Sequence, residues 1–343
     1  MPPPEAQVAV ERFRKLLEAR DRQAAIQMVR AYADVYRQLQ RDTMALVRIS
    51  KERALKPWEV MRLNRYKTLE RQFLANTARF AEMAAMNATQ AQLAAIQIAR
   101  AGAEQTVEAA LPRGIKLENF ARLGIGWDRL PDEAFANYVG IAADGSPLGQ
   151  LFAELGPDAA VKIRTAIGNG IALGKGPRAT AELVRIQAGM PLSRALLITR
   201  TETNRAFREA TRLQYANNDR LVKGYRRHAD KGPNTCLACI ALDGTLYQLD
   251  EPLNEHPNGR CAMVPEVLDF ADLGLDVPPS PQPGNARDWL ANQPESTQRD
   301  ILGGRRFDAW KDGRIQLDEL ATVRGNSTWG DAAVVKPLRD LGI

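Results

Sequence analysis

Histidine and cysteine are scarce in this chain of 343 residues, which contains two histidines and three cysteines. Histidine is the side chain that most often carries acid–base chemistry near neutral pH. No Ser-His-Asp or Cys-His arrangement can be recognised among so few residues, and a nucleophile needs such a partner for its activation. This scarcity argues against catalysis, and we expect the protein not to be an enzyme.

Long apolar runs are also missing. The most apolar segment, from Phe80 to Ala103, is interrupted by Glu82, Asn87, several glutamines and Arg100, so no transmembrane helix is expected. The first residues, Met-Pro-Pro-Pro-Glu, lack the basic and then apolar pattern of a secretory signal. We therefore expect a protein that is made and used in a reducing cytoplasm, where three cysteines suit metal binding or free thiols better than disulfides.

Glycine is absent before Gly102, and Pro57 is the only proline between the opening residues and Pro112. Residues 6–110 therefore predict long helices with one break near Lys56-Pro57. Apolar residues recur there at steps of three and four, the pattern of an amphipathic helix, as in Phe13, Leu16, Leu17, Val29, Tyr32, Val35, Tyr36 and Leu39. We expect an N-terminal helical arm or bundle.

The predicted fold class is mainly α with a small α+β module. Glycine and proline at 112–126 mark a boundary between an N-terminal helical region (1–112) and a central helical domain (113–220). Weak strands at 221–227 and 245–249, which bracket the Asp243-Gly244 turn, predict a short β-hairpin in a Cys/His module (221–270). A Pro-rich linker (271–285) leads to a helical C-terminal tail (286–343), which such a spacer would let dock separately. The linker prolines are Pro278, Pro279, Pro281 and Pro283.

Cations are concentrated between residues 41 and 80, where ten lysines and arginines face four acids. The resulting +6 equals the formal charge of the whole chain. Such a local excess favours an acidic partner such as nucleic acid or an acidic protein surface. We predict weak contact with double-stranded DNA, without sequence preference, through Arg62, Arg65, Lys67 and Arg71. The alternative is a solvated basic helix face.

All three cysteines and one histidine fall within a window of 26 residues, as Cys236-Leu-Ala-Cys239 and His256-Pro-Asn-Gly-Arg-Cys261. Two residues between the first pair let both sulfurs reach one ion from a tight turn. A second pair returned by a hairpin or loop would complete the tetrahedral Cys3His set of structural zinc. We predict one structural zinc ion held by Cys236, Cys239, His256 and Cys261. The alternative is three small buried thiols, with His256 as a turn residue.

A helix over residues 194–215 is expected to carry Arg200, Glu202 and Asn204. Arg200, Asn204 and Arg208 share one face at four-residue spacing, while Glu202 points elsewhere. An Arg-Thr-Glu triplet is also compatible with an active site such as that of an ADP-ribosyltransferase, but that chemistry requires the Arg and the Glu on distant strands. A helix that carries both fits ion pairing within the scaffold. We interpret these residues as a structural motif.

Residues 196–265 as a whole resemble a known family. They run from Leu-Leu-Ile-Thr-Arg200-Thr-Glu202-Thr-Asn204 through Tyr225…Asp230, Cys236-x-x-Cys239 and Leu242-Asp243-Gly244 to His256-Pro-Asn-Gly-Arg-Cys261 and Pro265. This order is similar to that of the Mu F-like phage head morphogenesis family, the minor head or minor capsid proteins that associate with the portal. The chain departs from the family at Gly259, where members often have Cys, so that Cys261 must serve alone as a ligand there.

The resemblance implies a structural role at the portal vertex during head assembly and DNA packaging, in a virion assembled in the host cytoplasm. The implied partners are the portal protein, the capsid or scaffolding protein and the packaged double-stranded DNA, with no membrane. The alternative function is a zinc-supported nuclease or toxin-like enzyme carried in the virion. That chemistry would require His228 to activate water, since His256 is assigned to the metal. We expect His228 at the surface or in an interface instead.

Overall fold

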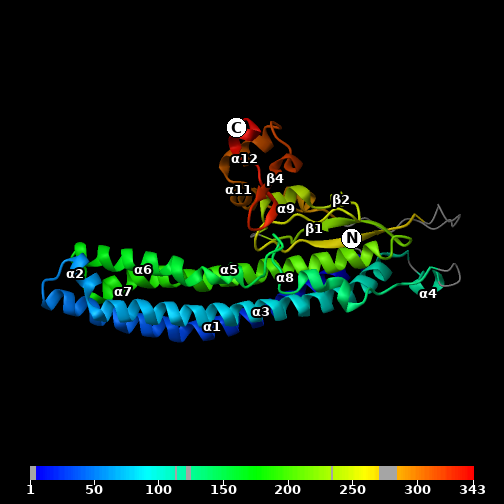
Figure 1. Ribbon diagram of the computed structural model, residues 1–343. Coiled ribbons are helices and arrows are strands. Elements are labelled where there is room, and N and C mark those ends of the chain that lie inside the picture. The colour runs from blue at the N-terminus through cyan, green and yellow to red at the C-terminus, as the bar shows by residue number, and fades with distance from the viewer. Residues whose placement is uncertain (1–4, 113, 121–124, 233–234, 270–283) are drawn as a thin grey trace. The chain divides into compact units, whose positions relative to one another are not determined.

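The computed structural model describes residues 5–112, 114–120, 125–232, 235–269 and 284–343 (Figure 1). These residues are mostly helical, with two small antiparallel sheets, which confirms the predicted mainly α fold with a small α+β module. The four linker prolines lie outside the described residues. Neither the two longest helices nor any other helix in the described ranges offers a stretch apolar enough to span a bilayer.

The chain divides into two compact units. Unit 1 consists of residues 1–19, 92–139 and 204–343, and unit 2 consists of residues 20–91 and 140–203. Three long helices contribute residues to both units: α1 (Glu5–Glu52), α3 (Asn64–Ala110) and α8 (Met190–Ala216). The absence of glycine before Gly102 and the periodic apolar residues explain the length of α1 and α3.

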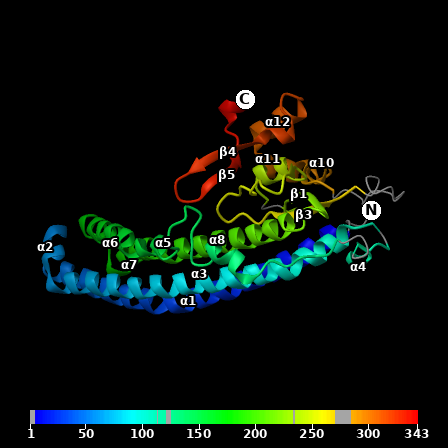
Figure 2. The same ribbon diagram turned by 45° about the vertical axis from the view of Figure 1, so that its right-hand side comes forward.

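The regular elements of unit 2 are all helices, and an isolated bridge joins Ile141 to Pro147. Its shorter helices are α2 (Pro57–Arg62), α5 (Gln150–Ala153), α6 (Leu155–Ala172) and α7 (Pro177–Ala188). Within it, α1 and α3 run side by side (Figures 1 and 2). The predicted break is confirmed, because α1 ends at Glu52 and Pro57 opens α2.

Close packing in unit 2 depends on small residues and on one buried hydroxyl. A Cβ on Gly156 would lie 2.5 Å from Oγ1 of Thr77, so glycine lets α6 approach α3 at this point. The hydroxyl of Tyr32 donates to the carbonyl oxygen of Ala188 at 2.7 Å, and its ring packs on Phe80 with a centroid distance of 4.7 Å. These contacts join helices that are distant in the sequence into one bundle.

Unit 1 contains a three-stranded antiparallel sheet in the order β2–β1–β3, formed by β1 (Val222–His228), β2 (Leu246–Tyr247) and β3 (Ala262–Val267). The strands predicted at 221–227 and 245–249 correspond to β1 and β2. β3 was not predicted, although it pairs along β1 from Val222 to His228. Helix α9 (Leu237–Leu242) lies between β1 and β2 in the chain, and two further short helices, α4 (Leu117–Phe120) and η2 (Asp132–Tyr138), precede α8.

The C-terminal segment differs from the predicted helical tail. It contains α10 (Ala286–Ala291), α11 (Glu295–Leu302), α12 (Gly304–Lys311), η4 (Leu317–Leu320) and η5 (Leu338–Leu341), but also a hairpin of β4 (Ala321–Asn326) and β5 (Gly330–Val335). The side-chain oxygen of Asn326 accepts from the amides of Thr328 and Trp329, which closes the turn.

This C-terminal segment shares one hydrophobic core with the sheet. Leu290 and Leu320 belong to the same cluster of buried residues as Tyr225 and Ile240. The expectation that the tail docks separately is therefore wrong for the described residues. Proline content in 271–285 suggested a spacer, but the apolar faces on both sides of that segment pack together, because burial of large side chains favours one contiguous core.

Candidate metal centre

Two chain segments of unit 1 bring the Cys/His residues together. Cys236 is the N-cap of α9 and Cys239 lies one turn later, so the Cys-x-x-Cys spacing places both thiols at the start of one helix. His256 and Cys261 lie on the loop that leads into β3. In this loop Asn258 has a positive φ of 65°, and the amide of Gly259 donates to the carbonyl oxygen of His256 at 2.9 Å.

The four predicted ligands gather around Cys239, but not as one closed cluster. Ligand atoms of Cys236, Cys239 and His256 all lie within 4.8 Å of one another, and so do those of Cys239, Glu255 and Cys261. Cys239 Sγ lies 3.3 Å from His256 Nε2. No group among the described residues contains all four predicted ligands within that limit. Cys239 is therefore common to both sets of donors.

Glu255 is the residue of this centre that the sequence did not single out. Its carboxylate pairs with Arg227 at 2.8 Å, and both side chains are 0% exposed. It also accepts from the thiol of Cys239 at 3.6 Å. Burial alone would raise the pKa of Glu255, but Arg227 and Arg208 hold the pKa of this carboxyl below its ordinary value. Its position directly before His256 is the only signal that the sequence offered.

The chain's departure from the family pattern at Gly259 has a structural counterpart. A Cβ on Gly259 would lie 1.9 Å from Cγ of Glu255 and 2.3 Å from its Cδ. The space that a side chain at position 259 requires is therefore filled by Glu255. The Glu255 carboxylate can therefore occupy this buried position only because residue 259 has no side chain.

The thiols and the imidazole of the centre perturb one another. A hydrogen bond from Cys239 lowers the pKa of Cys236 to about 4 against the effect of burial, and His256 adds to this. The hydrogen bond to Cys236 raises the pKa of His256 to about 9, although burial opposes it. Hydrogen bonds with Cys236 and Cys261, together with burial, raise the pKa of Cys239. Without metal, a Cys236 thiolate beside a His256 imidazolium and a protonated Cys239 thiol are thus the expected state at neutral pH.

Helix α8 supports the loop that carries His256 and Cys261. The side-chain amide of Asn204 donates to the carbonyl oxygen of Gly259 at 2.9 Å, and Arg208 donates to the same oxygen at 3.4 Å. The four-residue spacing of Asn204 and Arg208 had predicted a shared face. Because both residues donate to the same carbonyl oxygen, the face of α8 that carries them and the loop that contains Gly259 form one structural unit.

The other two residues of the predicted structural motif lie on α8 within unit 2. Arg200 pairs with Asp21 at 2.6 Å, and this pair is partly exposed rather than buried. Glu202 is fully buried. The interpretation of these residues as structural is not tested by a known relative and stays a prediction.

The Asp243-Gly244 turn also anchors parts of unit 1. The carboxylate of Asp243 is buried and accepts from the amide of Ala229 at 2.6 Å and from the amide of Ala286 at 2.5 Å. Gly244 adopts a φ of 82° and its amide donates to the carbonyl oxygen of Arg227 at 2.8 Å. One carboxylate thus links the end of β1 to the start of α10.

His228 was expected at the surface or in an interface, and the surface placement is wrong. Its side chain is 2% exposed and its Nε2 lies 3.2 Å from a carboxylate oxygen of Glu11 and 3.4 Å from the amide of Gln7. Asp230, two residues later, pairs with Arg14 at 3.0 Å. β1 ends where the first turns of α1 cover it, which is a tertiary arrangement that local sequence does not reveal. His228 is therefore engaged in packing and is closed to bulk water.

The predicted DNA-contact residues lie on the surface of unit 2. Arg62, at the end of α2, covers the ring of Trp58 at 4.9 Å, and Arg65, Lys67 and Arg71 are exposed on α3. All ten cations between residues 41 and 80 are exposed. Within the part of the chain that the structure describes, none of the ten forms an ion pair.

Comparison with protein families finds a match to part of the chain. Residues 161–264 match the family model described as Phage Mu protein F like protein. The matched segment includes the Arg-Thr-Glu motif of α8, β1, α9 and all four predicted metal ligands. The resemblance deduced from residues 196–265 is thereby confirmed. No curated protein and no solved structure matches the chain.

Proposed function

On the premise that residues 161–264 match the Mu F-like family of phage head morphogenesis proteins, we propose that the chain acts structurally at the portal vertex during head assembly. In this role it is a minor head protein of the virion with the portal protein as its partner. Contact with capsid or scaffolding protein belongs to the same proposal. The role requires no catalysis.

The observation that best supports a structural role is the way in which the family segment is built. Asn204 and Arg208 hold the loop of His256 and Cys261 through Gly259, and Glu255 in that loop is locked to Arg227. The conspicuous polar groups of the segment are thus used to fix backbone, as in a rigid attachment module. His228, the residue that an alternative nuclease would require as its base, is buried and engaged.

Quantitative peptide counting in purified proheads and mature heads tests this proposal. We expect the protein in both, at a few copies per particle, and we expect it to co-purify with portal rings. Two variants provide a matched comparison. Asn204→Ala should reduce retention in heads, whereas Asn217→Ala, at an exposed position directly after the end of α8, should not. Absence of the wild-type protein from both particles would rule out the role.

We further propose that Cys236, Cys239, His256 and Cys261 hold one structural zinc ion. The donor chemistry fits zinc, which prefers thiolate and imidazole ligands. The buried charges fit as well. Arg227 and Arg208 are both buried, and Glu255 forms its ion pair with Arg227. Among the described residues no carboxylate lies within ion-pair distance of Arg208. Zinc with three thiolates and a neutral imidazole carries a charge of −1, which balances the excess positive charge.

The zinc would act as a staple for the loop between α9 and β3, because binding free energy becomes folding free energy when the site forms only in the folded chain. Four protein ligands leave no open coordination position, so the ion would not activate water. In the structure the thiol of Cys261 groups with Cys239 and Glu255 and not with Cys236 and His256. It would therefore have to shift toward Cys236 and His256 to complete the zinc site.

Elemental analysis of protein purified without chelator distinguishes the zinc site from a buried thiol cluster. We expect one zinc per chain, and Cys239→Ser should lose it together with solubility or portal attachment. A folded protein with a zinc content well below one per chain would support the thiol cluster instead.

The basic surface of unit 2 supports a third proposal, weak and non-specific contact with packaged double-stranded DNA. Three of the four acids in this region are engaged: Glu70 pairs with Arg164 at 2.5 Å, Glu59 accepts from the amide of Lys56 at 2.7 Å, and Asp42 accepts from Gln38 at 2.7 Å. The exposed cations therefore face solvent without an ion-pair partner among the described residues. A positive field of this kind attracts a polyanion without reading its sequence.

Salt-dependent binding to a duplex of random sequence tests the DNA contact. If about six phosphates are neutralised, affinity should fall on the order of 10³-fold between low and moderate salt. Reversing Arg62, Arg65 and Arg71 to Glu should abolish binding. Unchanged retention by that variant would show that these residues only solvate the helices.

A further inference from the structure

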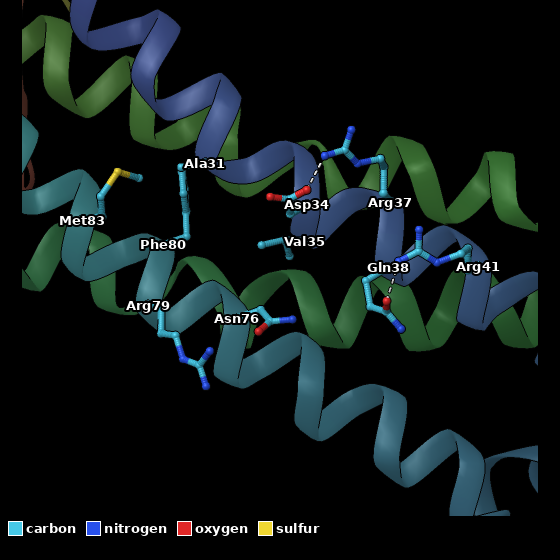
Figure 3. Close-up of a pocket in the computed structure, with 10 residues that line it drawn as sticks. All are labelled: Ala31, Asp34, Val35, Arg37, Gln38, Arg41, Asn76, Arg79, Phe80 and Met83. Carbon is cyan, nitrogen blue, oxygen red and sulfur yellow. Dashed lines mark hydrogen bonds and ion pairs between the residues drawn. The ribbon is translucent and has the colours of Figure 1, made fainter.

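A groove runs between α1 and α3 in unit 2, outside the segment that matches the family. It encloses a cavity of about 480 Å³. Figure 3 shows Ala31, Val35 and Phe80 between the two helices, with Arg37 and Arg41 along α1 and Arg79 along α3. The groove therefore combines an apolar floor with a cationic rim.

The lining residues have the spacing of a helix-binding groove. On α1 they include residues 31, 34, 35 and 38, and on α3 they are residues 76, 79, 80 and 83. Both sets follow the i, i+3, i+4, i+7 pattern, so each helix presents two successive turns to the cavity. Side chains of a third helix can pack into such a channel between two parallel or antiparallel helices. Phe80, at 3% exposure, and Val35 form the base of this channel.

The cations beside the groove form a line along α1. Arg30, Arg37, Arg41 and Arg48 are separated by seven, four and seven residues, which returns each of them to within about 20° of one line on the helix. At 1.5 Å per residue the line is about 27 Å long. All four side chains are exposed. A partner helix with acidic side chains at the same spacing would place them opposite these four arginines.

The rim is only partly neutralised by its own neighbours, because one of its three arginines forms an ion pair within it. Arg37 is bound by Asp34 and Arg41 donates to Gln38 at 2.6 Å, which holds both guanidinium groups in place (Figure 3). Within the described ranges, Arg79 has no hydrogen bond or ion pair. Asp34 is the only acid among the residues that line the cavity, against three arginines. The groove thus carries an excess positive charge over an apolar floor.

From this combination we propose that the α1–α3 groove binds an acidic amphipathic helix of a partner protein. Apolar side chains of that helix would pack on Ala31, which is exposed, and on Met83, which is half-buried, above the buried side chains of Val35 and Phe80. Its acidic side chains would pair with Arg41 and Arg79 and compete with Asp34 for Arg37. Duplex DNA fits the groove less well, because phosphates gain nothing from a concave apolar floor and would meet Asp34 at the rim. The proposal is independent of the DNA contact through Arg62, Arg65 and Arg71.

Fluorescence anisotropy with the full-length protein tests the proposal. The probe is a labelled synthetic peptide of about 18 residues, the length that matches the arginine line, with Leu at i, i+3 and i+7 flanked by Glu. We expect saturable binding of one peptide per chain. A scrambled peptide of the same composition, which has the same charge but no apolar stripe, should bind at least about tenfold more weakly.

Three variants locate the site. The charge reversal R37E/R41E/R79E should weaken peptide binding at least about tenfold, since three charge pairs become repulsive. The matched reversal R62E/R65E/R71E changes the net charge by the same amount and should alter binding by less than about twofold. Ala31→Trp fills the groove without a change in charge, so it should weaken binding of the peptide but leave binding of a duplex of random sequence unchanged.

Several outcomes would overturn the proposal. Equal binding of the scrambled peptide would show attraction by net charge alone. An equal loss in the two charge reversals would lead to the same conclusion. If R37E/R41E/R79E or Ala31→Trp abolished duplex binding and left peptide binding intact, the groove would be part of a DNA surface. Circular dichroism and thermal melting of each variant confirm that these exposed positions leave the fold intact.

Discussion

The substitution Gly259→Ala examines the most tightly packed point of the metal centre. Glycine here has an ordinary φ, so an added methyl group introduces no backbone strain, and its effect comes from packing alone. The new Cβ would lie 1.9 Å from Cγ of Glu255, which is the middle of the side chain and not its flexible end. Glu255 cannot move without breaking its pair with Arg227, and both side chains are 0% exposed.

The magnitude follows from these two effects. Overpacking a well-filled site costs about 1–3 kcal/mol. Breaking a buried ion pair costs about 3–5 kcal/mol, because it leaves a buried charge without its partner. We therefore expect Gly259→Ala to lower the free energy of unfolding by at least about 3 kcal/mol. For a unit of this size that corresponds to a fall in melting temperature of at least about 6 °C.

Urea unfolding of unit 1, followed by a signal from its tryptophans, measures this change. The control is Gly126→Ala, which also lies in unit 1, since a Cβ there meets nothing within 4 Å and its φ is not in the left-handed region. This control should stay within about 0.5 kcal/mol of the wild type. If Gly259→Ala were as stable as the control, the dependence between residues 255 and 259 would be refuted.

Three other perturbations test separate parts of the structure. Arg227→Met should cost about 3–5 kcal/mol, whereas Arg226→Met, which breaks a half-exposed pair, should cost about 1 kcal/mol or less; similar costs would contradict the role of burial. The hydrogen bond with the buried imidazole of His228 lowers the pKa of Glu11 to about 2, so the Glu11 carboxylate stabilises the fold above pH 4.5 and this contribution is lost as the pH falls through about 2. Glu11→Gln should therefore make the free energy of unfolding in urea depend less on pH in that window. Parallel curves for the variant and the wild type would contradict this. Gly156→Ala should cost about 1–3 kcal/mol and Thr77→Ala should relieve part of that cost, so additive effects in the double variant would exclude the contact.

The Cys/His centre shows the difference between what spacing indicates and what packing adds. Cys-x-x-Cys and His-x4-Cys predicted that the four residues meet, and they do lie around Cys239. Their arrangement in two overlapping sets depends on Glu255, which enters the centre because Gly259 leaves room for it. A carboxylate with its partner 28 residues away in the chain gives no local signal, so the sequence could not distinguish it from a surface Glu.

The sequence by itself determined the helical elements, the break at Pro57, the Cys/His window and the family segment, because these depend on local spacing and on residue type. Only the tertiary structure decided that β3 completes the sheet, that His228 is buried under α1, and that the C-terminal segment shares the core of unit 1. It also decided that the arginine line of α1 borders a groove with α3. The physical reason is that helix formation is encoded within a few turns, whereas burial and ion pairing depend on which distant surfaces meet.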